Sequence, residues 1–356
     1  MNTASTFRPT AIPLAAIALS LISAGCGGAT GSSTTTTPTP PPSLTSGGAT
    51  SVYVIENPIS GNNSILQFSA TANGTVNPSS TLTLPSGFGP TCVATDTLGQ
   101  IYVGGELNSY PSTVEVLIYA AGSTGAATPT RTITGGLDVL NAPQAMVVDS
   151  SGQLYVLTGF IEGGVRVYAA NANGAATPLR TIQGPLTQFD VDGEALALDH
   201  AGTVYVATLG VSGGGQVYAF APGLSGNVAP TRTIASTSTG SGTIWTMDTD
   251  TAGNLYVVGL ANGLPVVSTI YEFGSTASGA ATPIRTIAGA YASLAYVRSL
   301  HIDAAGNIYI AGATTASVPY VAAFASTASG NIGPSISFTS SSFADTAIGT
   351  TSVALK

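Results

Sequence analysis

The seven residues Asp96-Thr-Leu-Gly99-Gln-Ile101-Tyr102 determine how this chain folds, because the same phrase returns four more times. Each copy reads Asp-x-x-Gly-x-aliphatic-Tyr, and each lies between two short apolar runs. The copies occupy residues 96–102, 149–155, 199–205, 250–256 and 303–309. Their regular spacing of about fifty residues indicates a repeat architecture built from one supersecondary unit.

Each phrase predicts a tight turn between two β-strands. An Asp at the first position accepts a hydrogen bond from the backbone two residues later, and the Gly supplies the positive φ that a type I turn with a bulge requires. We therefore interpret Asp96, Gly99 and their counterparts as structural residues. The alternative is a ring of Asp-based calcium turns, but no second or third oxygen ligand recurs beside the Asp.

Two further phrases recur with the same period. One is a strand that ends in an aromatic residue, as in Val165-Arg-Val-Tyr168, and the other is a Pro-led strand, as in Pro178-Leu-Arg180-Thr-Ile182. Each period therefore holds four short strands: one before the Asp turn, the Tyr strand, the aromatic strand and the Pro-led strand. Units of four strands in a row are typical of the blades of a β-propeller.

The two ends of the chain set the number of blades. The first unit begins at its Tyr strand, Ser51-Val-Tyr53-Val54, and lacks the strand that precedes the turn elsewhere. The chain finishes with Thr351-Ser-Val353-Ala-Leu355, which resembles Thr91-Cys-Val-Ala94 and supplies that strand. Closing the ring in this way removes two exposed sheet edges. We expect an all-β, six-bladed propeller of four-stranded antiparallel blades over residues 50–356, closed by the C-terminal strand.

The repeated Asp-x-x-Gly-x-aliphatic-Tyr phrases make residues 50–356 resemble the NHL-repeat family of six-bladed propellers. The resemblance implies a fold rather than one activity, because such propellers serve as lyases, lactonases, signalling ectodomains and protein-binding platforms. It also implies that two sets of connections gather around the central channel on one side, which we call the loop face. These are the loops from the Tyr strand to the aromatic strand and the connections from each outer strand to the next inner strand.

The first 26 residues have the layout of a bacterial export signal, with Arg8, an apolar core over residues 11–22 and small residues before Cys26. The small residues resemble a lipoprotein processing site, which implies that Cys26 becomes the acylated first residue, although Ser23 stands where an aliphatic residue is usual. Gly27 after the cysteine implies the outer membrane or cell surface. Residues 27–49 are rich in Gly, Ser, Thr and Pro and predict a tether. The alternative is a conventional cleaved signal followed by a linker and a periplasmic or secreted protein.

The charge of the chain excludes one class of partner. Only 7% of the residues are charged, against about 25% in typical domains, and the formal net charge is −8. An acidic surface with almost no lysine repels phosphate backbones, so we expect no nucleic-acid binding. We expect a monomer that contacts the membrane only through its N-terminal lipid.

Acidic residues in the connections suggest a metal site. The densest cluster, Asp190-Val-Asp192-Gly-Glu194, precedes the inner strand of the fourth blade. By the family geometry, Glu56, Glu106, Asp138 and Glu162 lie in or beside loops of the same face, so Asp190, Asp192 and Glu194 are candidate ligands of Ca²⁺, the one cofactor that we consider. The alternative is a solvated acidic loop.

Aromatic residues in the longer connections are candidate ligand-binding residues, because exposed rings can stack on sugars; they are Tyr110, Phe160, Tyr291 and Tyr320. Trp245, Arg298 and His301 lie on inner strands near the axis and either line a pocket or fill the channel. The recurring tyrosines predict packing between blades, with their hydroxyls bonded. The recurring arginines predict stems that cover apolar surface and heads that reach water. Cys92, in an apolar run, predicts a small buried thiol.

The sequence contains no phrase that specifies catalysis. There are two histidines, too few for the zinc chemistry of the amidating lyases, and no nucleophile elbow. We expect a surface or periplasmic propeller lipoprotein that acts as a binding protein or scaffold and recognises a protein or polysaccharide through its loop face. One alternative is a metal-dependent hydrolase or lactonase of the propeller type. Another is a structural envelope protein without a discrete ligand.

Overall fold

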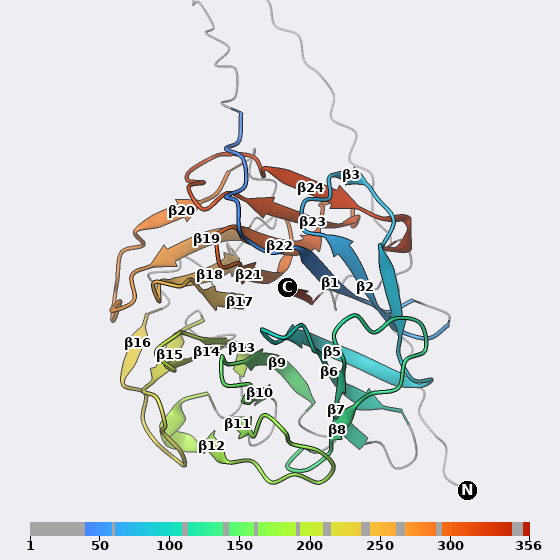
Figure 1. The fold of residues 1–356 in the computed structure, drawn as a ribbon. Helices are drawn as coiled ribbons and strands as arrows, with labels where there is room; N and C mark the ends of the chain where they lie inside the picture. Colours follow the sequence, from blue (N-terminus) through green and yellow to red (C-terminus); the bar gives the residue numbers. More distant parts are fainter. Residues whose placement is uncertain are drawn as a thin grey trace, which may run out of the picture. The chain divides into compact units, whose positions relative to one another are not determined.

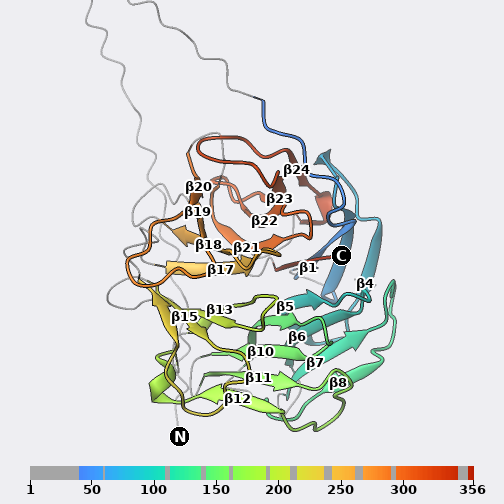
Figure 2. The ribbon, with the colours of Figure 1, turned by 60° about the vertical axis from the view of Figure 1, so that its left-hand side comes forward.

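The computed structural model describes one compact unit, Thr39–Lys356, through residues 40–58, 61–108, 113–137, 142–159, 163–189, 193–208, 215–235, 243–260, 268–289, 294–343 and 352–356. Six sheets surround a central axis in this unit (Figures 1 and 2). The prediction of an all-β, six-bladed propeller is therefore confirmed. In the same described residues, no helix has the length and apolar character that a membrane-spanning segment requires.

Each blade has four antiparallel strands in simple order from the axis outwards. Blade one consists of β25 (Val353–Leu355), β1 (Ser51–Glu56), β2 (Ser64–Ser69) and β4 (Ser80–Thr83). Blade two consists of β5 (Phe88–Thr95), β6 (Ile101–Leu107), β7 (Thr113–Tyr119) and β8 (Arg131–Ile133). Blade three consists of β9 (Pro143–Val148), β10 (Leu154–Thr158), β11 (Gly164–Tyr168) and β12 (Arg180–Gln183).

The remaining blades follow the same order. Blade four consists of β13 (Gly193–Leu198), β14 (Val204–Thr208), β15 (Val217–Phe220) and β16 (Arg232–Ile234). Blade five consists of β17 (Thr243–Thr249), β18 (Leu255–Leu260), β19 (Ser268–Phe273) and β20 (Arg285–Ile287). Blade six consists of β21 (Val297–Ile302), β22 (Ile308–Ala313), β23 (Pro319–Phe324) and β24 (Ile336–Thr339). The short strand β3 (Gly74–Thr75) and the 3-10 helices η1 (Pro185–Thr187) and η3 (Ser341–Phe343) complete the described elements.

The C-terminal strand closes the ring, as the sequence predicts. Strand β25 pairs antiparallel with β1, with Ala354 opposite Tyr53. The junctions on either side are tied by serines: Ser299 Oγ accepts the Val353 N–H at 3.2 Å, and Ser352 Oγ accepts the Val93 N–H at 3.3 Å. Blade one therefore joins the two ends of the chain and contacts both of its neighbours through its inner strand.

The Asp turns have the predicted geometry. Asp250 Oδ1 accepts the N–H groups of Ala252 and Asn254 at 2.9 and 2.8 Å. Gly253 has a φ of 80°, a region that only Gly enters without strain. The four other copies also place their Gly at positive φ. These turns therefore fix the hairpin between the inner strand and the Tyr strand in each full repeat.

The outer edge of each blade is covered by the next blade. Outer strand β24 pairs in parallel with β3, which belongs to the following turn of blade one. Single bridges repeat this contact at the other five junctions, as between Ile287 and Gly330. An outer strand whose edge is partly paired presents fewer free backbone groups to another chain. The neighbouring turn therefore protects part of the outer edge of each blade.

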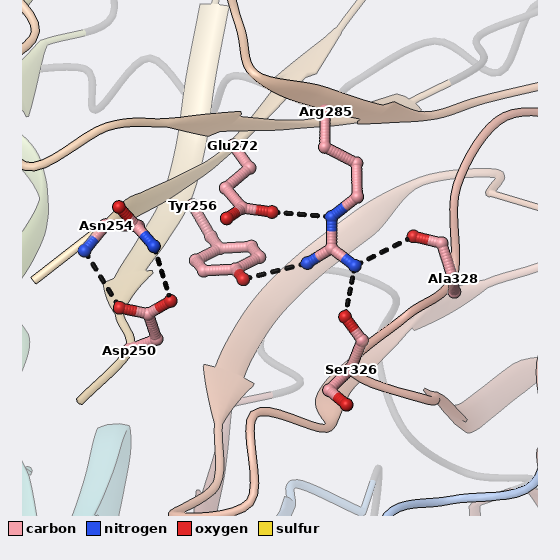
Figure 3. Close-up of polar contacts among 7 residues, drawn as sticks. All are labelled: Asp250, Asn254, Tyr256, Glu272, Arg285, Ser326 and Ala328. Carbon is pink, nitrogen blue, oxygen red and sulfur yellow. Dashed lines mark hydrogen bonds and ion pairs between the residues drawn. The ribbon is translucent and has the colours of Figure 1, made fainter. Parts of the chain in front are cut away.

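The recurring tyrosines and arginines form ties between blades, and Arg285 makes the most extensive one (Figure 3). Its Nε pairs with Glu272 at 2.5 Å, and its other nitrogens donate to the Tyr256 hydroxyl and to the carbonyls of Ser326 and Ala328 in blade six. The expectation that tyrosine hydroxyls find partners is confirmed here. The arginine heads differ from the expectation that they reach water: all four contact a tyrosine, and those of Arg131, Arg232 and Arg285 also donate to carbonyls of the next blade. Equivalent stacks join Arg131 to Tyr102, Arg180 to Tyr155 and Arg232 to Tyr205.

Residues 40–49, which the sequence assigns to the tether, lie on blade six; we call them the strap. Thr45 exchanges two hydrogen bonds with the side chain of Asn307, and Ala49 N donates to Asp303 Oδ2 at 3.0 Å. Gly48 lies so close that a β-carbon there would overlap the Asp303 carboxylate. Leu44 and Ala49 pack against the core between blades six and one. Blade six, which has Ile336 in place of the arginine, is therefore held by the strap.

Candidate functional site

The candidate functional site is a cavity on the central axis, with a volume of about 200 Å³. It is lined by inner strands β5, β9, β13, β17 and β21 and by Ser352, next to β25. All six blades therefore contribute to one space. Its lining residues are Thr91, Cys92, Val93, Gln144, Ala145, Met146, Glu194, Ala195, Leu196, Trp245, Thr246, Met247, Arg298, Ser299, His301 and Ser352.

A β-bulge shapes the inner strand of every full repeat at the same position. In β17, Ile244 pairs with Gly259 and Thr246 with Val258, so Trp245 is left without a partner on β18. The register shifts at the same place in the other four inner strands. A bulge turns its extra residue away from the ladder and re-aims the side chain. The five bulge residues are Thr91, Gln144, Glu194, Trp245 and Arg298; all line the cavity and all are partly exposed.

Two of these bulge residues form a stacked pair. The guanidinium carbon of Arg298 lies 3.8 Å from the centroid of the Trp245 ring, a close cation–π contact. Burial lowers the pKa of Arg298, and the negative charge of Glu194 opposes this shift. Trp245 Nε1 and Arg298 Nε are buried and have no hydrogen-bond partner among the residues that the structure describes. The two side chains are thus closely packed, and these two nitrogen atoms are enclosed by the surrounding protein.

Blades five and six contribute a second polar pair, Asp248 and His301. Each of these residues lies three positions after the bulge residue of its strand and is therefore nearer to the Asp turn. His301 Nδ1 lies 3.3 Å from Asp248 Oδ2, and His301 lines the cavity. Asp248 Oδ2 also accepts the Ile302 N–H at 2.9 Å. The carboxylate is therefore fixed by the neighbouring strand, and it in turn orients the imidazole, as acid–base pairs require.

Between the Trp245–Arg298 pair and the Asp248–His301 pair, side-chain hydroxyl groups join neighbouring blades by hydrogen bonds. Thr246 Oγ1 accepts the Leu300 N–H at 3.0 Å, and the two serines at the ring closure make the same kind of contact with the next strand. These hydroxyls accept backbone donors from the following blade. They hold the cavity wall in place, so the bulge residues and the Asp248–His301 pair have a rigid support.

The structure places the sequence-predicted site residues as follows. Glu194 lines the central cavity, whereas Asp190 and Asp192 lie outside the described residues. Tyr320 lies in β23 and is only 8% exposed, and its hydroxyl donates to the Ala295 carbonyl at 3.2 Å. It is a core residue and offers no open ring, because its strand faces the junction with blade five. Tyr110, Phe160, Tyr291 and the lipidation candidate Cys26 also lie outside the described residues.

No three His, Cys, Asp or Glu side chains come together as a metal-binding group in the part of the chain that the structure describes. Of the other loop-face acids, Glu56 accepts a hydrogen bond from Ser64 at 2.5 Å, and Glu106 is partly exposed near the end of β6. Asp138 and Glu162 lie outside the described residues. Cys92 is free and buried, as expected, and burial raises the pKa of its thiol to about 12, so the thiol is not an active nucleophile.

The bulges are the feature that sequence reasoning missed. Trp245, Arg298 and His301 stand out on the inner strands, but Gln144 and Thr91 do not. A signal does exist: the residue five positions before each Asp turn differs in every repeat and is polar or amphipathic within an apolar strand. Aligning the repeats on their Asp residues therefore reveals all five bulge residues.

Comparison with known proteins bears on the fold alone. No protein-family model and no curated protein sequence matches the chain. A solved structure of a protein of unknown function from Bacteroides caccae is similar over 85% of this chain and 98% of its own, with a TM-score of 0.58 and 11% identity. The WD40 β-propeller domain of Doa1 gives a TM-score of 0.47 at 11% identity, over 76% of this chain and 74% of its own. The first likeness shows that a solved structure shares this fold over most of the chain, and the second is too distant to carry an argument.

Proposed function

We propose that the protein is an exported binding propeller that recognises a polysaccharide or a protein through its loop face, with the central cavity as the specificity site. One observation carries this proposal. Positions that only build the fold, such as Asp250, Gly253 and Tyr256, are the same in every full repeat. The bulge position shares its backbone geometry in five blades yet has five different side chains.

A purely structural role gives no reason for this divergence. Five equivalent bulges need only a residue that tolerates the backbone, so one residue type would serve five times. A site that distinguishes the parts of an asymmetric ligand needs different groups around the axis. The combination of an aromatic ring with amide, carboxylate and guanidinium groups, in Trp245, Gln144, Glu194 and Arg298, favours a polar ligand such as a polysaccharide over a flat apolar protein surface.

We also propose that the protein is anchored by a lipid on Cys26 and is displayed at the outer membrane or cell surface. The support is the export signal, the small residues before Cys26 and the uncharged segment that follows. Mass spectrometry of the mature N-terminus tests the anchor. A terminus at Cys26 that carries acyl chains supports it, and an unmodified terminus further along the chain overturns it.

The binding function is tested with the mature full-length chain immobilised at its N-terminus. The probes are purified envelope polysaccharides and a soluble extract of envelope proteins. We expect saturable retention of a polysaccharide, and at least tenfold weaker retention by Trp245→Ala. The matched control is Tyr271→Ala, which removes a partly buried aromatic residue outside the cavity. Equal losses in both variants, or no retention of any probe, contradict the proposal; the second outcome favours a structural envelope protein.

A second candidate function is hydrolysis, and the Asp248–His301 pair favours it. The carboxylate orients the imidazole in the cavity wall, as in a general base. A hydrolase or lactonase with a divalent metal at Asp190, Asp192 and Glu194 is the form that the sequence suggests. Ca²⁺ or Mn²⁺ at millimolar concentration then raises the melting temperature by mass action, and Asp192→Ala removes the rise. If neither metal raises the melting temperature, and the lactones and polysaccharides offered as substrates are not hydrolysed in long incubations, this candidate is excluded.

A further inference from the structure

We propose that the central cavity binds one neutral sugar residue of a polysaccharide, against the stacked pair Trp245 and Arg298. This inference rests on the proposed function and names the ligand class of the same site. It is carried by the size of the cavity, by Trp245 in its wall and by the balance of the charges among its described residues.

The size of the cavity limits the ligand to one residue. Its volume of about 200 Å³ is below the range of roughly 300–1,000 Å³ for pockets that hold drug-sized ligands. Its described lining comes from the inner strands of five blades and from Ser352, next to β25, so the ring of strands sets its width there. The rest of a longer ligand therefore lies outside the cavity, on the loop face.

Trp245 supplies the apolar surface that a sugar ring needs. One side of a pyranose presents C–H groups, and an indole offers a large flat contact area at little cost in conformational entropy. The guanidinium group of Arg298, at 3.8 Å from the ring centroid, already holds the indole in place. Because the ring is positioned before the ligand arrives, less freedom is lost on binding.

The polar groups match hydroxyls better than they match an anion. Arg298 and Glu194 carry opposite charges that act on each other, and Asp248 lies beside His301. Among the described residues, the charges in and beside the cavity therefore offset one another, and the chain as a whole carries −8. The net negative charge of the chain repels carboxylate, sulfate and phosphate ligands at long range, and the offset charges in the cavity do not attract them. A sugar hydroxyl donates and accepts at once, so it can use both the amide and carboxylate oxygens of Gln144 and Glu194 and the donors of Arg298.

The experiment uses the only tryptophan of the chain as its reporter, since Trp245 lines the cavity. The mature full-length protein is titrated with methyl glycosides of glucose, galactose, mannose and N-acetylglucosamine, and with methyl glucuronoside as the anionic probe. We expect a saturable change in tryptophan emission with at least one neutral glycoside, and at least tenfold weaker binding of the glucuronoside.

Two variants show whether the sugar lies at the stacked pair. Arg298→Gln is expected to weaken binding of the neutral glycoside at least tenfold. Arg131→Gln, the matched control, makes the same change between blades two and three, away from the cavity, and is expected to bind like the wild type. Gln144→Ala serves as a second cavity variant, and circular dichroism checks that each variant is folded.

The outcomes separate this inference from the proposed function. If polysaccharide is retained but no monosaccharide alters the emission, recognition lies outside the cavity, and the inference is wrong while the function stands. If the glucuronoside binds as well as or better than the neutral glycosides, the argument from charge is wrong. If neither polysaccharide nor monosaccharide binds, both proposals are overturned.

Discussion

The side chain of Asn307 pairs with the backbone of Thr45 through two reciprocal hydrogen bonds, although 262 residues separate them in the sequence. Asn307 Oδ1 accepts the Thr45 N–H at 2.7 Å, and Asn307 Nδ2 donates to the Thr45 carbonyl at 2.8 Å. Asn307 is 1% exposed because the strap covers it. The same position in blade five is Asn254, whose amide donates to Asp250 within its own turn.

The first prediction uses this difference. Asn307→Ala removes both hydrogen bonds to the strap and the one that Nδ2 donates to Asp303 Oδ2, and at about 1 kcal/mol each the loss of stability is expected to be about 3 kcal/mol. The matched control Asn254→Ala loses only a contact within the turn and is expected to cost less. Thermal unfolding measures both, and limited proteolysis followed by mass spectrometry detects cleavage within residues 40–49 in Asn307→Ala alone. Equal protection of the strap in both variants contradicts the role that we assign to Asn307.

The strap shows where sequence reasoning about the fold stops. The turns were predictable because each depends on an Asp and a Gly a few residues apart, and the closure was predictable because a missing strand and a surplus strand match. Residues 40–49 have the composition of a flexible linker, and the phrase Asp303-Ala-Ala-Gly306-Asn307 that receives them resembles the phrase at Asp250. The docking depends on contacts between residues far apart in sequence, which local composition does not encode.

The candidate site, like the fold, was only partly predictable from the sequence. Trp245, Arg298 and His301 were recognisable as unusual residues on inner strands, and the structure shows that they line one cavity. Their arrangement around the axis was not recognisable from the sequence, because a bulge adds a residue to one strand without changing the length of the repeat. Tyr320 was misplaced for a related reason: it was assigned to a connection, whereas the hairpin of blade six extends β23 back to Pro319.

The second prediction concerns the ring closure. Removing residues 352–356 leaves blade one without its inner strand and exposes the edges of β1 and of the neighbouring inner strands. We expect aggregation, measured by light scattering and size-exclusion chromatography. Lys356→Ala is the control, because the backbone groups of Lys356 that pair with Thr50 and Ser51 remain. A truncated chain that elutes as a stable monomer contradicts closure by β25.

The third prediction tests the Asp turns. Gly253→Ala places a side chain at a φ of 80°, and we expect it to cost about 1 kcal/mol or more. Gly274→Ala, in the same blade, is the control, since no atom lies within 4 Å of the added β-carbon and its φ is not positive. Urea unfolding with a common m-value measures the difference. Identical midpoints for the two variants would refute the turn assignment.

The fourth prediction concerns Arg285. Arg285→Gln leaves buried Glu272 without its cation and frees the carbonyls of Ser326 and Ala328. Removing one partner of a buried ion pair is expected to cost about 3 kcal/mol or more. Arg180→Gln is the control, since Arg180 stacks on Tyr155 but has no carboxylate partner among the described residues. We expect the control to lose about 1 kcal/mol by thermal unfolding. A similar loss in both variants means that the ion pair adds nothing to the tie.

The fifth prediction is an alkaline transition. Burial raises the pKa of Tyr119, Tyr168 and Tyr309 to about 12, because the phenolate is poorly solvated in the core. An unfolded tyrosine ionises near pH 10. The fold therefore favours the neutral phenols: their contribution to stability is complete below about pH 10 and is lost as the pH rises towards 12. Tyrosinate absorbance and the β-sheet circular dichroism signal should change together in this range.

Tyr119→Phe isolates the cause of this transition. The Tyr119 hydroxyl is buried and has no hydrogen-bond partner among the described residues, so the substitution removes an ionisable group without breaking a hydrogen bond. We expect unchanged or slightly higher stability at pH 7, because an unsatisfied polar group is lost, and unfolding that begins at higher pH than in the wild type. If the part of the tyrosinate absorbance that Tyr119→Phe removes appears near pH 10 while the circular dichroism signal persists, the Tyr119 phenol ionises in the folded state, and its burial does not control the alkaline limit of this propeller.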